Sequence, residues 1–108
     1  MKSHNRKTKG SGLVVRETPS HATAESLTSI ARNHRGNSAQ NQRERILDAL
    51  RTHGAITTIE MRKYLDVMSP APRIMELRRM GKRITTHWVK QATDSGKAHR
   101  VALYVLEA

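Results

Sequence analysis

The chain is 108 residues long, enough for one small domain, and its 20 Lys and Arg against 9 Asp and Glu give a formal charge of +11. So basic a chain favours a polyanionic partner, nucleic acid before an anionic membrane. It has no cysteine, which excludes disulfide scaffolds and thiolate-bound zinc. No apolar run approaches the roughly 20 residues of a membrane helix, and no secretory signal pattern is found. We therefore expect a soluble, cytoplasmic protein with no membrane partner.

The first 40 residues are polar and basic and contain few large aliphatic side chains. A segment of this composition cannot bury enough apolar surface to offset its ordering entropy. We therefore predict a largely disordered basic N-terminal arm over residues 1–40. Within it, Leu27 and Ile30 lie at helical spacing, which indicates a short helix over residues 20–32 that orders only against a partner or the domain.

Residues 41–108 combine periodic apolar positions with helix start and stop signals, which predicts one folded domain. The first helix is expected over residues 42–53, because Asn41 and Glu44 have the spacing of a capping box. Gly54 ends this helix, since glycine is favoured just after a helix terminus. A short β-tolerant stretch then connects it to the next helix.

Two more helices are predicted in the middle of the domain. The second covers residues 58–65 and follows another capping box, formed by Thr57 and Glu60. The third covers residues 70–80, with Ser69 as its N-cap and prolines in its first turn, where a missing N–H costs little. Both helices are short, so they must pack against the rest of the domain.

The third helix divides into two faces when it is projected at 100° per residue. The face expected to be buried holds Ala71, Ile74 and Leu77. The opposite face holds Pro72, Arg73, Glu76, Arg79 and Met80. Arg78 lies near the buried face, so we expect it to pair with Asp48 or Glu60. The remaining arginines of the helices are expected on solvated faces: Arg43, Arg45, Arg51 and Arg62.

The last part of the domain has the pattern of a β-hairpin, with β-prone runs at residues 82–90 and 98–106 around a polar loop that contains glycine. Trp88 is expected in the core near Tyr104, and stacking on nucleic acid is the alternative interpretation. The second run has apolar residues on both faces, although such a hairpin normally buries only one. Its second face must be covered by the N-terminal arm, a second subunit or a partner protein. The residues of that face are Val101, Leu103 and Val105.

This order of elements resembles the small winged helix-turn-helix domains found in many phage and bacterial proteins. The most specific matching stretch runs from Ser69 to Arg78, and the weaker matches lie at residues 54–60, at residues 81–86 and at the end of the last strand. Asp66 stands in the turn, where it tolerates the left-handed conformation better than most residues. The resemblance implies a mainly α fold with a β-hairpin (α+β), a winged helix-turn-helix with three helices plus a wing.

The resemblance also implies double-stranded DNA binding, with the helix at residues 69–80 in the major groove and the hairpin at residues 82–106 as the wing. An arginine can contact guanine O6 and N7 with two hydrogen bonds, and a glutamate can accept one from cytosine N4. The candidate base-reading residues are Arg73, Glu76 and Arg79. For Glu76, an ion pair within the helix is the competing interpretation.

Contacts to the DNA backbone are expected from cations around the hairpin and from the starts of two helices. The candidates are Thr58, Ser69, Lys82, Arg83, Lys90, Lys97, His99 and Arg100. In the N-terminal arm, Arg6, Lys7 and Lys9 are expected to contact phosphates. These features favour a phage or mobile-element transcriptional regulator or replication accessory factor, in the cytoplasm or nucleoid of the host if the chain is phage-encoded.

Other functions are weighed against this one. A protein-interaction module that modulates a host or phage protein is the main alternative, and a homodimer or protein partner could use the second face of the last strand. No catalytic or cofactor-binding pattern is found, so we expect no enzyme activity and no cofactor. His87 and His99 could lie near each other across the hairpin, but with no cysteine and no paired carboxylate at ligand spacing we expect no metal site.

Overall fold

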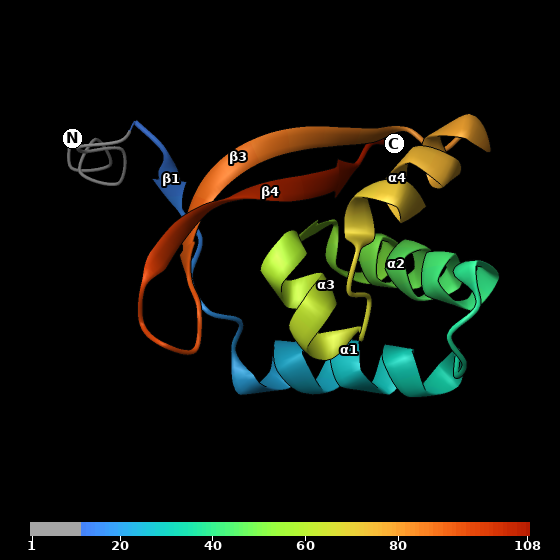
Figure 1. The fold of residues 1–108 in the computed structure, drawn as a ribbon, viewed down its shortest axis with the longest axis horizontal. Helices are drawn as coiled ribbons and strands as arrows, with labels where there is room; N and C mark the ends of the chain where they lie inside the picture. Colours follow the sequence, from blue (N-terminus) through green and yellow to red (C-terminus); the bar gives the residue numbers. More distant parts are fainter. Residues whose placement is uncertain (1–11) are drawn as a thin grey trace.

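The computed structural model describes residues 12–108, which fold into a group of helices beside a small sheet (Figure 1). The helices are α1 (His21–Asn33), α2 (Ala39–His53), α3 (Thr58–Tyr64) and α4 (Pro70–Arg79). The strands are β1 (Val14–Val15), β2 (Ala55–Thr57), β3 (Ile84–Ala92) and β4 (Ala98–Leu106). The predicted α+β class is therefore confirmed. Besides the three helices expected in the domain, the structure contains α1, which lies where a short helix over residues 20–32 was predicted.

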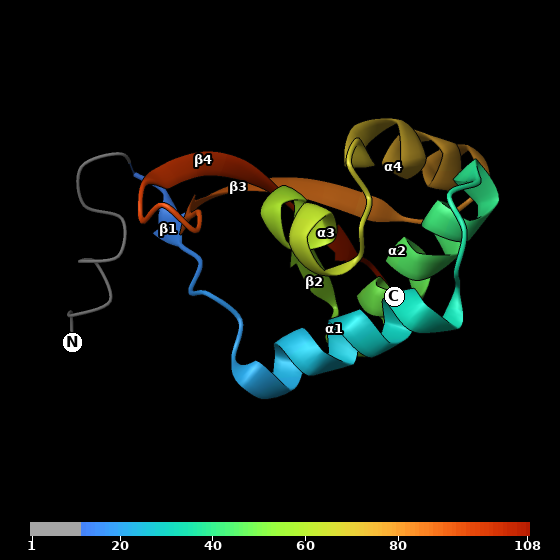
Figure 2. The same cartoon turned by 60° about the horizontal axis from the view of Figure 1, so that its bottom comes forward.

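The sheet has the strand order β1-β3-β4-β2. Strands β3 and β4 form the predicted hairpin, in which Ile84 pairs with Leu106 at one end and Ala92 with Ala98 at the other. Strand β2 adds antiparallel to β4, and β1 adds parallel to β3. Figures 1 and 2 show the hairpin arching over α3, with α1 on the opposite side of the helices.

All four helices and the sheet share one hydrophobic core. Its members, all buried, are Leu27, Ile30, Ile46, Ala49, Leu50, Ile56, Met61, Leu65, Val67, Ile74, Leu77, Ile84, Ala102 and Tyr104. Leu27 and Ile30 come from α1, within the segment predicted as an arm. The predicted division at residue 40 therefore does not mark the edge of the core, because α1 packs on the domain and orders there.

A polar network holds the segment that follows β1 against the start of α3 and the hairpin. The Arg16 side chain donates to both carboxylate oxygens of Glu60, at 3.0 and 2.9 Å, and to the Ala55 carbonyl at 3.0 Å. Gln91 of β3 donates to Glu60 at 2.6 Å and accepts from the Thr57 hydroxyl at 2.6 Å. Glu60 is 1% exposed. One buried carboxylate thus links the segment after β1, the start of α3 and the hairpin.

Two of the three predicted helix starts agree with the structure, and one differs. The capping box of Thr57 and Glu60 is present. The prediction of Asn41 as an N-cap is wrong: α2 begins earlier, capped by Ser38, and the Asn41 side chain donates instead to the Arg35 carbonyl. Ser69 is the N-cap residue of α4 but makes no side-chain capping bond.

Prolines explain the start of α4. Pro72 stands three residues after Ser69, at a position where the backbone N–H would normally be capped, and proline has no N–H to donate. The turn before the helix contains Asp66 with φ of 55°, the left-handed conformation that its residue type was expected to tolerate. Helix α4 thus starts where predicted. Because Pro70 and Pro72 have no N–H, two of the amide donors that would otherwise need a partner at the helix start are absent.

Candidate nucleic-acid interface

One side of α4 is buried and the other faces solvent. Pro70, Ile74 and Leu77 are buried, whereas the expectation of a buried Ala71 is wrong, because Pro70 takes that place in the core. Met75 is 49% exposed, and Arg79, one turn further on, is exposed as well. Met75 was not among the residues predicted for this face, although its spacing of four residues from Arg79 places the two side by side.

Arg73 and Glu76 lie at the edge of this exposed face and form an ion pair. Arg73 donates to one carboxylate oxygen of Glu76 at 2.9 Å, and Arg43 of α2 donates to the other at 2.8 Å. The hydrogen bond from Arg43, helped by the charge of Arg73, lowers the pKa of Glu76 below its ordinary value. Two of the three predicted base-reading residues, Arg73 and Glu76, are therefore engaged within the protein, and Arg43 is paired rather than solvated.

Arg78 joins α4 to the hairpin. Its guanidinium donates to the Ile84 carbonyl and to the Thr86 hydroxyl, each at 2.8 Å. The prediction that it pairs with Asp48 or Glu60 is wrong, because Arg16 occupies Glu60 and His34 lies 3.2 Å from Asp48. The contact fixes the end of the exposed helix against the first residues of β3.

The hairpin exposes an aromatic side chain next to cations. Trp88 is 48% exposed, and the Arg100 guanidinium lies 4.3 Å from the centre of its ring, within cation–π distance. The prediction of a core Trp88 is therefore wrong. In the strand register, Trp88 pairs with Ala102, and Lys90 two residues further on pairs with Arg100, so both cations lie on the same face of the hairpin as the indole.

The other predicted backbone-contact residues lie at several places on the surface. Lys97 and His99 are exposed at the hairpin loop and the start of β4, and Arg83 is exposed between α4 and β3. Ser69 is exposed, and Thr58 and Lys82 are partly buried. Nearby, Lys63 of α3 donates to Asp94 in the loop at 2.6 Å, which raises the pKa of Lys63 above its ordinary value.

Some predicted features fall elsewhere. Arg6, Lys7 and Lys9 lie outside the described residues. His87 pairs with Leu103, and His99 pairs with Gln91, so the two histidines are not opposite each other in the hairpin. Across residues 12–108, no group of three or more histidine and acidic side chains is placed to hold a metal ion.

The second face of β4 is only partly buried. Val101, Leu103 and Val105 all have intermediate exposure. Leu103 lines a surface hollow together with Val14, Val15 and Val89, so the segment around β1 lies along this face. Strand β1 pairs with the edge of β3 and leaves Val14 and Val15 exposed, so this face stays partly open, and which of the three predicted covers shields it remains a prediction.

These elements define a class of fold. A helix, a short strand and a second helix lead through a tight turn into α4, which is followed by a hairpin, as in a winged helix-turn-helix. A family model described as a winged helix-turn-helix domain matches residues 41–108, and the chain belongs to this family. No curated protein and no solved structure matches the chain. The family supports a general DNA-binding role. Separately, no described helix is both long and apolar enough to cross a bilayer.

Proposed function

We propose that this protein binds double-stranded DNA, with α4 in the major groove and the β3–β4 hairpin as the wing. The observation that carries the proposal is the position of Arg79 and Met75 on the exposed side of α4, with Arg78 holding that helix to the hairpin. The formal charge of +11 favours a polyanionic ligand. On this proposal, the exposed side of α4 and the β3–β4 hairpin contact the same duplex.

Within α4, we propose Arg79 as the main base-reading residue. Its guanidinium has only a long contact of 3.5 Å with the Met75 sulfur, so it can turn to guanine O6 and N7 without breaking an ion pair. Met75 is placed to contact the methyl group of thymine. Arg73 must leave its ion pair with Glu76 before it can contact a base, and Glu76 must leave both Arg43 and Arg73. We therefore assign Arg73 and Glu76 a secondary role.

The backbone contacts follow from the exposed cations. Around the hairpin and the helix starts, we propose phosphate contacts for Thr58, Ser69, Lys82, Arg83, Lys90, Lys97, His99 and Arg100. Arg6, Lys7 and Lys9 are proposed to add a sequence-independent term. A binding protein of this kind, without catalytic activity, fits a transcriptional regulator or replication accessory factor of a phage or mobile element.

A titration with two labelled duplexes tests this proposal. The first is a preferred sequence selected from a random library, and the second is an unselected sequence. The Lys7→Ala variant is expected to weaken binding to both duplexes alike and to flatten the dependence of affinity on salt, because it removes a phosphate contact. Binding to neither duplex at low salt would refute the DNA-binding role.

A second candidate is favoured by exposed methionines near α4. Met68, Met75 and Met80 are 62, 49 and 61% exposed, and flexible methionine side chains suit adaptable protein contacts. On this alternative, the module binds and modulates a host or phage protein. Negligible duplex binding at low salt, despite the charge, would favour it over the first proposal.

A further inference from the structure

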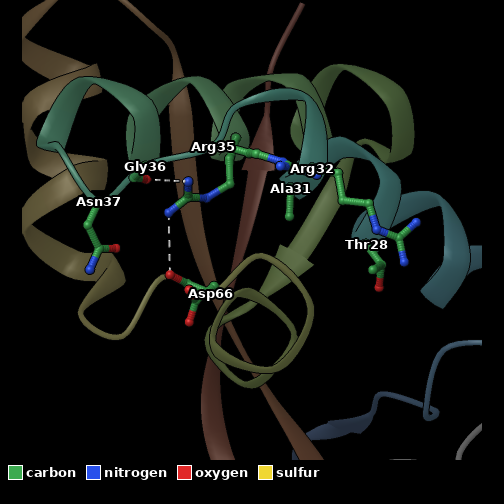
Figure 3. A pocket seen from close by; sticks show the side chains of 8 residues that line it. Thr28, Ala31, Arg32, Arg35, Gly36, Asn37 and Asp66 are labelled. Atoms are coloured by element: carbon green, nitrogen blue, oxygen red, sulfur yellow. Dashed lines mark hydrogen bonds between the residues drawn. The ribbon is translucent and has the colours of Figure 1, made fainter.

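A basic hollow lies between α1 and the turn that precedes α4. It has a volume of about 410 Å³ and is lined by the end of α1, the α1–α2 connection and Asp66 (Figure 3). Arg32 and Arg35 contribute two of its walls, and both side chains are exposed. Neither forms an ion pair within residues 12–108. None of this lining was predicted from the sequence as a site.

The floor of the hollow is a buried arginine. Arg45 was expected on a solvated helix face, but it is only 3% exposed. Its guanidinium donates to the carbonyl oxygens of His34 at 2.6 Å, Gly36 at 2.8 Å and Asp66 at 3.4 Å. These bonds connect the α1–α2 segment to the turn before α4.

The charge of Arg45 is not balanced by a carboxylate. Its three partners are neutral carbonyl groups, its Nε atom has no hydrogen-bond partner, and it forms no ion pair in the described part of the chain. A buried cation normally requires a counter-charge, because desolvation disfavours the charged form. Asp66 is the only acidic residue in the lining and stands against three arginines, so the hollow has a net positive charge.

From this arrangement, we propose that the hollow binds a phosphate group. A phosphate accepts several charged hydrogen bonds from arginine guanidinium groups, and it would supply the counter-charge that Arg45 lacks. A second hollow at the start of α4 shares Asn37 and Asp66 with this one and includes Ser69 and Arg73. The phosphate can have two sources. It is either a backbone phosphate of a duplex bound at α4, a source that rests on the proposed function, or the phosphate group of a free molecule.

The direct test is a titration of the full chain with inorganic phosphate, followed through the arginine Nε–Hε signals in NMR spectra at constant ionic strength. We expect a saturable shift of the Arg45 signal. The variants Arg32→Gln and Arg35→Gln should each weaken phosphate binding about tenfold, the effect of losing one charged hydrogen bond. Arg51→Gln is the matched control, because Arg51 is an exposed arginine on α2 outside this lining.

Each result decides a separate question. No saturable shift, or an equal loss of affinity in Arg51→Gln, would overturn the phosphate site, whether or not the protein binds DNA. If the site holds a duplex phosphate, Arg35→Gln should also lower the salt dependence of duplex affinity by about 0.9 in the log–log slope. If phosphate binding is lost while that slope is unchanged, the ligand is a free phosphate group. A protein that binds phosphate but no duplex would refute only the DNA-binding proposal.

Discussion

Residues 12–37 and residues 38–108 contribute to the same core but differ in how the sequence encodes them. The second region contains the family-matched domain, with local signals for its last two helices and its hairpin. The first region looks like a tail, yet it supplies β1 and α1 and buries Leu27 completely. A polar segment therefore orders when a few well-placed side chains meet a surface already built by the rest of the chain.

The largest expected effect is on the apolar contact between the two regions. Leu27→Ala should lower the free energy of unfolding by about 3 kcal/mol, because the side chain is fully buried and its removal leaves a cavity. Urea denaturation measures the change. Ser29→Ala is the control on the exposed side of α1, expected within about 0.5 kcal/mol of the parent protein. Equal stability of the parent protein, Leu27→Ala and Ser29→Ala would mean that the packing of α1 does not contribute to the stability of the fold.

A smaller loss is expected from the polar contact. Arg16→Ala removes the cation that faces buried Glu60 and should cost about 2 kcal/mol, within the range for leaving a buried acceptor short of a partner. Adding Glu60→Gln should recover part of this loss, since the amide carries no charge. The double-mutant cycle is read from denaturation midpoints. Additive effects of the two substitutions would show that the ion pair contributes no coupling energy.

The next prediction concerns the second region alone. Arg79→Ala should reduce affinity for the preferred duplex roughly tenfold, since a good base contact gives about 1–3 kcal/mol of discrimination, and should affect an unselected duplex much less. Fluorescence anisotropy with both duplexes measures the difference. Arg51→Gln serves again as the control for lost charge. An equal loss on both duplexes would remove Arg79 from base readout.

The smallest effect is expected at Glu76. Because Arg43 and Arg73 lower its pKa in the folded state, its contribution to stability is present above its ordinary value of 4.5 and is lost as pH falls through the lowered folded value. The Glu76→Gln variant should therefore show a slightly weaker dependence of stability on pH in that acid range. Thermal unfolding between pH 3 and 6 is the measurement, and identical profiles would contradict the pKa shift.

The sequence predicted those elements whose signals are local. The capping box of Thr57 and Glu60, the glycine after α2 and the proline-rich start of α4 each act within a few residues. By contrast, the partners of Arg16 and Arg45 depend on contacts across 44 and 21 residues, which no periodicity encodes. The start of α2 is a different case, because Ser38 and Asn41 are both competent caps. The Asn41 side chain donates to the nearby Arg35 carbonyl, and the helix takes the earlier start at Ser38.

In the candidate interface, the sequence predicted the exposed Arg79 but not its surroundings. The helical projection found the exposed side of α4, yet it could not show that Arg43 reaches Glu76 from a neighbouring helix. Trp88 alternates with Ile84 and Thr86 along its strand, and this alternation predicts a core position. Here the position next to Arg100 stabilises its exposed ring.

Methionine methyl NMR spectra test directly whether the exposed side of α4 contacts duplex DNA. On addition of a duplex at low salt, the signals of Met75 and Met80 should shift, while that of Met61, fully buried in the core, should stay in place. Saturable DNA binding that leaves Met75 and Met80 unchanged would contradict the account.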